Sequence, residues 1–325
     1  YNYLGHTGLK VSEICLGTMT FGASDNYGIP TCDEETSFKL MDRYRELGGN
    51  FLDTADVYGP YNSEKIVGSW IKKNDVRKEM IIATKGRFET GFGPNDGGLS
   101  RKHIIEAVES SLSNLQTDYI DLYQVHLWDA GAPLRETLMT LNDLVRIGKI
   151  RYIGCSNFSG WQLQKAIDLS KQMGLEMFAS VQQQYNLLDR FSELETFQVA
   201  HHERLSILPW SPLKGGWLTG RYKKDEAPTD ISESRIAHSD VTGWDITSYQ
   251  YWAKNPTTWT VLDKVEQIAK QLNKSMAQVS LRWVMQRPSV GATIIGARNM
   301  QQLEDNCAAA FFTLSPEQMQ ELTEA

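Results

Sequence analysis

The chain alternates between short apolar runs and longer stretches in which apolar residues recur at three- and four-residue steps. Most of the short runs are continuously apolar, as expected for strands buried on both faces of a parallel sheet. The predicted strands cover residues 14–17, 50–53, 81–85, 120–126, 150–156, 179–182, 206–210 and 293–295. Two further runs, at residues 3–5 and 9–11, flank His6-Thr7-Gly8 and predict a β-hairpin before the first strand.

Helices with one apolar face are predicted between these strands, because the apolar spacing there follows the helical period. They cover residues 37–47, 63–73, 102–115, 134–147, 161–173 and 193–202, then 261–272 and 276–286 before the last strand, and 300–308 and 317–324 after it. Gly148 is placed to end the helix over 134–147, and Ser315-Pro316 to begin the last one. Residues 213–255 are polar and irregular, and a loop of this length is usually functional or mobile.

About eight strand–helix units predict an α/β fold, a closed (β/α)8 TIM barrel with an N-terminal β-hairpin and additional helices near the C-terminus. The chain has 325 residues and shows no change of composition that would mark a second domain. Barrels of this type often reach such a length as one unit. We therefore expect residues 1–325 to form a single domain.

Composition and charge exclude several classes of protein. Hydrophobic residues make up 41% of the chain, which is too many for a disordered protein, and no apolar run has transmembrane length. The net charge of −7 argues against nucleic acid as a partner. The four cysteines, Cys15, Cys32, Cys155 and Cys307, are widely separated and show no metal-binding spacing. This pattern fits a reducing compartment, so we expect a cytoplasmic protein with no membrane, nucleic acid or metal partner.

The C-terminal ends of the strands carry the chemistry in barrels of this type. Asp53 and Tyr58 follow the second predicted strand, Lys85 ends the third and His126 ends the fourth. An ammonium beside a phenol favours the phenolate and lowers the pKa of the tyrosine, and an aspartate keeps the lysine charged. A histidine opposite can orient a carbonyl oxygen. The four residues together predict that Tyr58 protonates a carbonyl oxygen as hydride reaches its carbon.

Each of the four also has a structural explanation when it is taken alone. Asp53 could cap a turn, Tyr58 could pack in a turn, Lys85 could be an ordinary charge at a strand end, and His126 could be a core histidine. All four coincidences would have to fall on three neighbouring strands. The combination therefore favours the catalytic interpretation.

The segments GNFLDTADVYG, IIATKG and IDLYQVH, in this order, resemble the active-site blocks of the aldo-keto reductase superfamily. The resemblance extends over almost the whole chain through LGTMTFG, GKIRYIGCSNFS, SVQQQYNLLDR, LPWSPLKGGWLTGRY and IIGARNMQQLEDN. It is closest to the bacterial-type and potassium-channel β-subunit-like branches. It implies Tyr58 as the general acid, Lys85 and Asp53 as residues that tune it, His126 as the residue that orients the carbonyl, and a monomer or weak oligomer.

The same resemblance implies an NADPH site. The residues expected to hold the cofactor are Thr18, Ser156, Asn157, Gln182, Trp210, Ser211, Leu213, Gly215, Leu218, Gly296, Arg298, Gln302, Asp305 and Asn306. Backbone N–H groups at Gly296-Ala297 can approach a phosphate where a helix begins, and the fork of Arg298 suits a 2′-phosphate. NADPH is therefore expected in preference to NADH. No GxGxxG follows a predicted strand, so a Rossmann-type site is not predicted.

The leading hypothesis is an NADPH-dependent reductase that converts a small-molecule aldehyde or ketone into an alcohol. The alternatives are a cofactor-binding regulatory module resembling potassium-channel β subunits, and an enzyme that forms a Schiff base on Lys85. The candidate substrate residues are Phe21, Tyr27, Arg87, Phe88 and Trp128, with Trp217 and the segment 213–255 also expected at the mouth. Arg87 and Lys214, beside aromatic walls, would suit a polar or carboxylated carbonyl such as an open-chain sugar or uronate derivative.

Overall fold

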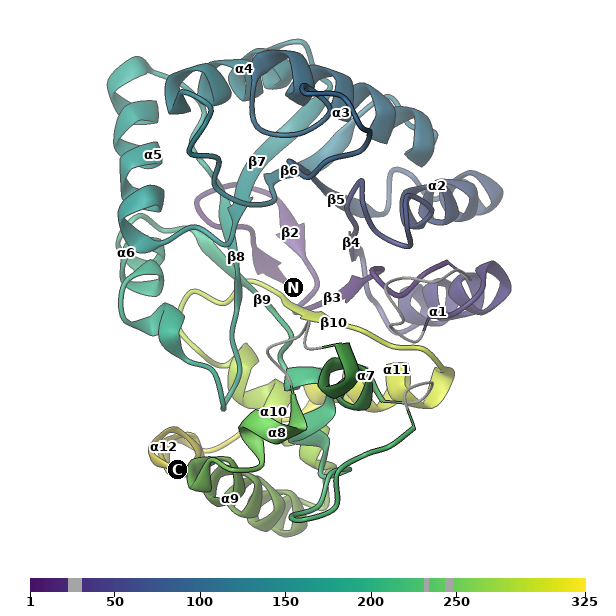
Figure 1. The fold of residues 1–325 in the computed structure, drawn as a ribbon, viewed down its shortest axis with the longest axis vertical. Helices are drawn as coiled ribbons and strands as arrows, with labels where there is room; N and C mark the ends of the chain where they lie inside the picture. Colours follow the sequence, from purple (N-terminus) through teal and green to yellow (C-terminus); the bar gives the residue numbers. More distant parts are fainter. Residues whose placement is uncertain (23–30, 231–233, 243–247) are drawn as a thin grey trace.

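Eight parallel strands form one sheet in the order β10-β3-β4-β5-β6-β7-β8-β9. The computed structural model describes residues 1–22, 31–230, 234–242 and 248–325, and Figure 1 shows helices around the strands. The strands are β3 (Ile14–Gly17), β4 (Phe51–Asp53), β5 (Ile81–Gly86), β6 (Ile120–Val125), β7 (Ile150–Ser156), β8 (Ser180–Gln184), β9 (Ser206–Trp210) and β10 (Thr293–Ile295). Each of them matches a strand predicted from the apolar runs.

The sheet closes into a barrel between β9 and the segment that leads into β10. Ile207 pairs in parallel with Val290, and its N–H donates to the Ser289 carbonyl at 2.8 Å. The Gly291 N–H donates in turn to the Ile207 carbonyl at 3.0 Å. Since β10 pairs with β3 at the other edge of the sheet, the (β/α)8 barrel prediction is confirmed.

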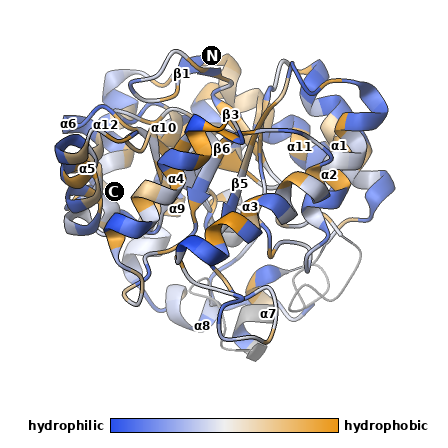
Figure 2. Ribbon diagram, turned by 90° about the horizontal axis from the view of Figure 1, so that it is seen from above, coloured by the Kyte–Doolittle hydropathy of each residue, from blue (hydrophilic) through white to orange (hydrophobic). Residues whose placement is uncertain are grey.

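The helices cover the outside of the barrel with their apolar faces inward and polar faces outward (Figure 2). Six of them follow β3 to β8: α1 (Glu34–Glu46), α2 (Ser63–Asn74), α3 (Arg101–Leu115), α4 (Leu134–Arg146), α5 (Gly160–Met173) and α6 (Thr196–His202). The later ones are α9 (Pro256–Leu272), α10 (Met276–Met285), α11 (Met300–Cys307) and α12 (Pro316–Glu324), with short 3₁₀ turns η1 (Phe191–Glu193) before α6 and η3 (Ala308–Phe311) after α11. The predicted helices are confirmed, with shifts only at their ends.

The segment that follows β9 is more ordered than its sequence predicts. It contains η2 (Lys214–Thr219), α7 (Arg235–Thr242) and α8 (Tyr249–Trp252), so the expectation of one irregular loop over 213–255 is wrong in these parts. The reason is an aromatic cluster: the buried Trp217 ring stacks on Tyr249 at 5.4 Å and contacts Tyr222 and Trp259. Burial of these rings stabilises the segment without a helical period in its sequence.

The predicted hairpin forms from β1 (Asn2–Tyr3) and β2 (Lys10–Val11), which pair antiparallel. Its Leu4 side chain is fully buried, and the Gly5 N–H donates to the Ser206 hydroxyl at 2.7 Å. Figure 2 places β1 at the opposite end of the barrel from α7 and α8. The hairpin therefore closes the end at which the strands begin and leaves the other end for chemistry.

An apolar layer fills the barrel next to the hairpin, and a polar layer lies directly above it. The buried residues of the apolar layer are Leu4, Val11, Cys15, Phe51, Ala83, Leu122, Ala179, Leu208, Ala292 and Ile294. Side chains two positions apart on a strand point to the same face. Asp53, Lys85 and Gln124 stand two positions beyond members of this layer on β4, β5 and β6, so all three point into the barrel.

In the part of the chain that the structure describes, no helix is both long and apolar enough to cross a membrane, and no cluster of His, Cys, Asp and Glu could hold a metal ion. The four cysteines are buried free thiols.

The hairpin contact with the barrel can be tested by Leu4→Ala. This change removes a fully buried side chain, and we expect the free energy of unfolding to fall by about 2 to 5 kcal/mol, as for other buried leucines. Urea denaturation measures it. Tyr3→Ala is the matched control because Tyr3 is the neighbouring residue and is 58% exposed. Equal effects of the two changes would contradict burial of the hairpin.

Candidate active site

Lys85 lies at the centre of the polar layer with all three protons of its ammonium engaged. The Nζ atom donates to Asp53 Oδ1 at 2.5 Å, to the Thr54 carbonyl at 2.8 Å and to the Tyr58 hydroxyl at 3.3 Å. A lysine ammonium has three donors, so this set fixes its position. The side chain is completely buried. Burial acts to lower the pKa of Lys85, but Asp53 and Tyr58 outweigh it and raise the pKa, so the ammonium stays charged.

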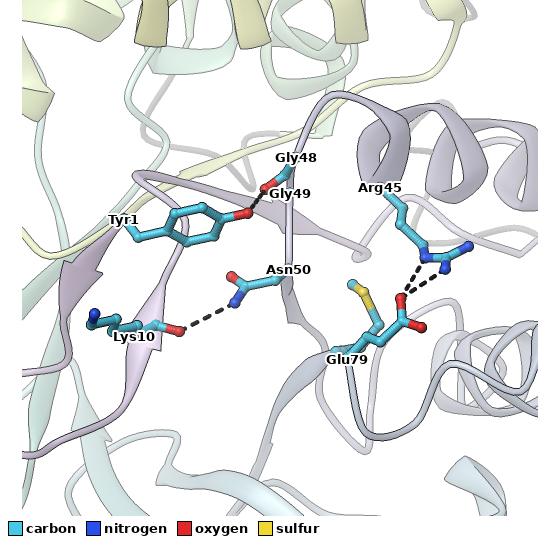
Figure 3. Close-up of a pocket in the computed structure, with 8 residues that line it drawn as sticks. Tyr1, Lys10, Arg45, Gly48, Gly49, Asn50 and Glu79 are labelled. Carbon is cyan, nitrogen blue, oxygen red and sulfur yellow. Dashed lines mark hydrogen bonds and ion pairs between the residues drawn. The ribbon is translucent and has the colours of Figure 1, made fainter.

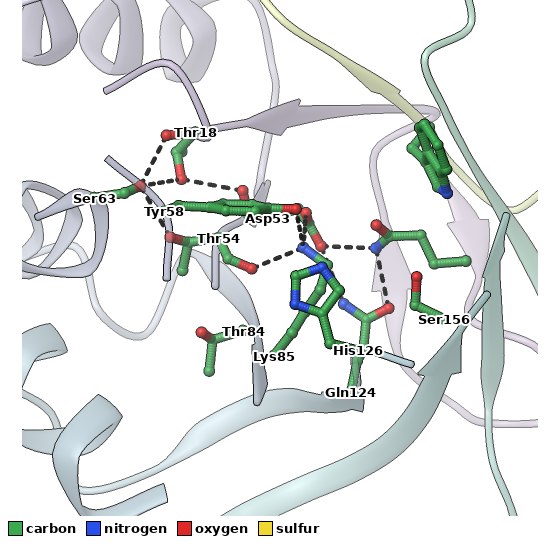
Figure 4. A network of polar contacts seen from close by, with 12 residues as sticks. Thr18, Asp53, Thr54, Tyr58, Ser63, Thr84, Lys85, Gln124, His126 and Ser156 are labelled. Atoms are coloured by element: carbon green, nitrogen blue, oxygen red, sulfur yellow. Dashed lines mark hydrogen bonds and ion pairs between the residues drawn. The ribbon is translucent and has the colours of Figure 1, made fainter. Parts of the chain in front are cut away.

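The Asp53 carboxylate is held from its other side by two side-chain amides. Asp53 Oδ2 accepts from Gln124 Nε2 at 3.0 Å and from Gln182 Nε2 at 2.9 Å. Gln182 also donates to Gln124 Oε1 at 3.1 Å. Figure 4 shows this chain of contacts across the barrel interior. Sequence reasoning missed Gln124, although a glutamine at an inward position of the run LYQVH is a usable signal.

Tyr58 stands in the turn between β4 and α2, with its hydroxyl against the lysine. Because the Tyr58 oxygen accepts a hydrogen bond from Lys85, its own proton is directed elsewhere. Burial raises the pKa of Tyr58 more than the charge of Lys85 lowers it. The expected net lowering is therefore wrong for this state of the protein. The phenol keeps its proton at neutral pH, as a proton donor must.

His126 faces Tyr58 and is held in place by its neighbours. The two rings are 5.8 Å apart in an edge-to-face arrangement, and the Phe88 ring lies 4.8 Å from the imidazole. Burial holds the pKa of His126 well below its usual value, and the charges of Lys85 and Arg87 lower it further. The imidazole is therefore neutral at pH 7. Its Nδ1 atom has no hydrogen-bond partner in the described residues.

The residues predicted to hold the nicotinamide form one chain of hydrogen bonds beside His126. Trp210 Nε1 donates to Asn157 Oδ1 at 3.1 Å. Asn157 Nδ2 is 3.1 Å from both the Ser156 hydroxyl and the His126 carbonyl. The structure thus brings Ser156, Asn157 and Trp210 together, whereas the amide nitrogen of Gln182 is already used by Asp53 and Gln124.

The segment predicted to contact the pyrophosphate has the backbone of a tight turn. Ser211 and Gly215 have φ values of 50° and 63°, a region that favours glycine. Asn186 Nδ2 donates to the Ser211 carbonyl at 3.0 Å and fixes the start of the turn. Leu213 is half-buried, whereas the Leu218 side chain is fully buried in the core, so Leu218 can offer a ligand only its backbone.

The last predicted cofactor group lies where β10 leads into α11. Gly296 is exposed, and a Cβ added to it would meet nothing within 4 Å. Gln302 Oε1 accepts from the Arg298 N–H at 2.9 Å, and Asn306 Nδ2 donates to the Gly296 carbonyl at 3.2 Å. These two residues hold the turn. Asp305 instead accepts from the hydroxyl of Ser275, the N-cap of α10, at 2.9 Å and from Gln278 Nε2 of that helix at 2.8 Å, which gives it a structural role.

Thr18 is fully buried and acts within the protein. Its N–H and hydroxyl both lie against the Asp53 carbonyl, at 2.9 and 3.1 Å. Its hydroxyl is also 2.7 Å from the Ser63 hydroxyl, which in turn lies 2.9 Å from that of Thr54 (Figure 4). These contacts tie the ends of β3 and β4 to the start of α2, so Thr18 positions the residues around Asp53.

The predicted substrate residues separate into three groups. Arg87 and Phe88 are half-buried beside His126, and Trp128 is half-buried with its ring 5.5 Å from that of Trp161. Tyr27 lies outside the described residues. Phe21, Trp217 and Lys214 are fully buried, so the expectation that they line the mouth is wrong. Phe21 and Trp217 belong to the hydrophobic core, and Lys214 pairs with Asp189 at 3.0 Å.

A second buried acid stands two residues before Tyr58. Both carboxylate oxygens of Asp56 lack a hydrogen-bond partner in the described residues. Burial, together with the charge of Glu64, raises the pKa of Asp56 to about 8. Glu64 is itself held by Thr84 at 2.6 Å and Asn114 at 3.0 Å. No local pattern in the sequence indicates this cluster, which lies behind the strand that carries Lys85.

A pocket of about 390 Å³ lies at the other end of the barrel (Figure 3). Its lining residues come from the starts of strands and the end of α1: Tyr1, Lys10, Arg45, Gly48, Gly49, Asn50, Glu79 and Met80. Arg45 and Glu79 neutralise one another across it at 2.7 Å. It is separate from the residues around Lys85.

Comparison with known proteins identifies the family. The model of the aldo/keto reductase family matches residues 13–325. The chain is similar to an uncharacterized oxidoreductase, YrpG, of Bacillus subtilis (strain 168), with 36% identity over 98% of this chain and 93% of that one. It is 33% identical to an aryl-alcohol dehydrogenase (NADP(+)) of Phanerodontia chrysosporium, over 98% and 83% of the two chains. It is also 33% identical to a versiconal hemiacetal acetate reductase of Aspergillus parasiticus, over 100% and 96%.

The chain therefore belongs to the aldo/keto reductase family and is an enzyme of that family. The family prediction is confirmed, and its assignment to a particular branch stays a prediction.

Asp56 predicts a distinct dependence of stability on pH. Its pKa is about 8 when folded and about 3.9 when unfolded, so between these values the folded chain binds the additional proton. The contribution of Asp56 to the free energy of unfolding is highest below about pH 4. It falls by at most about 1.4 kcal/mol per pH unit as the pH rises to about 8. Asp56→Asn removes this dependence.

Urea unfolding of both proteins at pH 5, 6.5 and 8 measures the difference. We expect wild type to lose stability relative to Asp56→Asn as the pH rises. Asp263→Asn, at an exposed position of α9, serves as the control. Parallel curves for wild type and Asp56→Asn would contradict the raised pKa.

Proposed function

We propose that this enzyme reduces aldehydes or ketones to alcohols with NADPH, and that Tyr58 donates the proton. The observation that supports this most directly is the hydrogen bond from Lys85 to the Tyr58 oxygen. It leaves the phenol proton available to a substrate and places a fixed positive charge where the phenolate forms. A carbonyl oxygen within reach of Tyr58 would also lie beside the neutral imidazole of His126.

The reaction balances with these residues. Bound NADPH would supply the hydride that reaches the carbonyl carbon. Tyr58 transfers its proton to the carbonyl oxygen as negative charge develops there, and His126 orients that oxygen. The phenolate that remains is stabilised by the Lys85 ammonium, whose charge Asp53 maintains. Tyr58 regains a proton from solvent after the alcohol leaves.

The residues present fit NADPH. Ser156 offers a hydroxyl and Asn157 an amide for the nicotinamide carboxamide, and Trp210 offers a ring beside them. Open space next to Gly296 lets a phosphate approach the backbone at the start of α11, and Arg298 would pair with the 2′-phosphate. A relative whose name specifies NADP(+) supports the same cofactor.

The structure does not favour a Schiff base on Lys85. A nucleophilic amine must be neutral, whereas the pKa of Lys85 is raised by Asp53 and Tyr58 and all three of its donors are engaged. We further propose that residues 1–325 form one domain, that the enzyme is a monomer or weak oligomer, and that it works in the cytoplasm. The four free thiols support the last point.

Tyr58→Phe tests the proton donor. The change removes the phenol oxygen and keeps the ring, so we expect kcat for benzaldehyde reduction to fall by about 10² to 10⁴, with the Kd for NADPH unchanged. NADPH absorbance and fluorescence report the two quantities. Tyr61→Phe is the control because Tyr61 lies in the same turn and is partly exposed. A Tyr58→Phe enzyme with wild-type kcat would overturn the assignment.

Arg298→Ala tests cofactor preference. Loss of a charge-assisted bond to the 2′-phosphate should weaken NADPH binding by about 10- to 100-fold, while NADH binding stays the same. Titration with both cofactors measures this. Arg146→Ala, at an exposed position of α4, should leave both affinities unchanged. If Arg298→Ala weakened NADH and NADPH equally, the arginine would not read the 2′-phosphate.

A further inference from the structure

Arg87 starts a loop that is fastened at both ends. It follows β5 directly, two residues beyond Lys85. The Gly98 N–H donates to the Arg87 carbonyl at 2.7 Å, and the Leu99 N–H donates to Asp129 Oδ2 at 2.8 Å. The loop over residues 87–98 is therefore held against the segment after β6, and the backbone of Arg87 has a defined position.

Within the described part of the chain, the Nε atom of Arg87 is not held as that of the half-buried Arg77 is. The Arg87 Nε atom is buried and has no hydrogen-bond acceptor among the described residues. Arg77 shows the contrast: its three nitrogens donate to Thr117, Met80 and Tyr119 at 2.7 to 3.0 Å, and it pairs with Asp121. A buried donor without an acceptor costs about 1 to 3 kcal/mol. Such a donor indicates an acceptor that a ligand brings.

Aromatic contacts place this cation close to His126. The Arg87 guanidinium lies 5.4 Å from the centre of the Phe88 ring, and that ring packs edge-on against His126. The charge of Arg87 is close enough to lower the pKa of the His126 imidazole. A substrate oxygen between Tyr58 and His126 would therefore have the Arg87 guanidinium nearby.

The charges around the site are not balanced. Asp53 neutralises Lys85 at 2.5 Å, and Asp189 pairs with the buried Lys214 at 3.0 Å. No carboxylate of the described residues forms an ion pair with Arg87. Within the described part of the chain, its positive charge thus has no counter-ion.

From these contacts we infer that Arg87 binds an anionic group on the carbonyl substrate, so the preferred substrates are aldehydes or ketones that carry a carboxylate or a phosphate. The planar fork of the guanidinium matches both groups. The inference rests on the proposed carbonyl reduction and adds the substrate class. Arg87 is then a residue that determines specificity, while Tyr58, Lys85 and His126 act on the carbonyl of any substrate.

Paired substrates test this inference. The 2-, 3- and 4-carboxybenzaldehydes are compared with the corresponding methyl formylbenzoates, in which a neutral ester replaces the carboxylate. Glyceraldehyde 3-phosphate and glyceraldehyde form the phosphate pair and distinguish the two anions. We expect wild type to prefer at least one charged member by 10-fold or more in kcat/KM with NADPH.

Variants then assign the preference to Arg87. Arg87→Met should abolish it, chiefly through a higher KM for the charged member, so that the ratio of kcat/KM between the charged and neutral members falls by about 10-fold or more. Arg87→Lys should retain part of it because the charge remains. Arg135→Met, at an exposed position of α4, removes the same charge elsewhere and should change neither value. NADPH binding and thermal unfolding verify that the variants are folded.

The outcomes separate the inference from the proposed function. If wild type reduces both members of every pair equally, or if Arg87→Met keeps the preference, the inference is wrong and carbonyl reduction stands. If wild type reduces none of these carbonyls with NADPH, both are overturned. Equal rates within wild type overturn the inference without any variant. If Arg87→Met folds poorly, Arg87→Gln removes the same charge in its place.

Discussion

The structure of the site depends on a buried ion pair whose hydrogen-bonding groups are all satisfied. Burying an ammonium and a carboxylate costs several kcal/mol per ion unless each finds close partners. Here Lys85 donates to three acceptors, and Asp53 accepts from Lys85 and two amides. Because these partners come from four different strands or their ends, the ion pair requires the whole barrel to close correctly. In return, the barrel places the ammonium against the Tyr58 oxygen without freedom to turn away.

Burial shifts the pKa values of the groups around the ion pair in opposite directions. It raises the pKa of Tyr58 and lowers that of His126, so both are neutral at pH 7, while Asp53 and Tyr58 keep Lys85 charged. The result is one phenol with a proton to give, one neutral imidazole beside it, and one fixed cation behind the phenol. Proton transfer to a carbonyl oxygen needs these three states together. If the same residues were exposed to solvent, burial would no longer hold these three protonation states.

The sequence predicts this arrangement well where its signals are local. Continuous apolar runs mark the strands, and chemistry at their ends must meet because parallel strands of a barrel end on the same side; Asp53, Tyr58, Lys85 and His126 follow from this. Gln124 was not predicted because it lies within a run that reads as apolar, and its role depends on the register of β6 against β5. Lys214, by contrast, was predicted near the substrate and lies buried in the protein. Its charge suggested exposure, but pairing with Asp189 and burial depend on contacts that no local pattern shows.

Under the inferred role of Arg87, one barrel separates chemistry at Lys85 from recognition at Arg87. The two cations are two residues apart, but Lys85 belongs to a strand and has its counter-ion within the protein, whereas Arg87 begins a loop and has none in the described residues. A cation that is neutralised internally acts on any carbonyl at the site. A cation without an internal counter-ion would discriminate, because an anionic group on the substrate both accepts from its donors and neutralises its charge. Since loops vary more readily than barrel strands, the inferred role of Arg87 would let the choice of substrate change while the ion pair of Lys85 and Asp53 is kept.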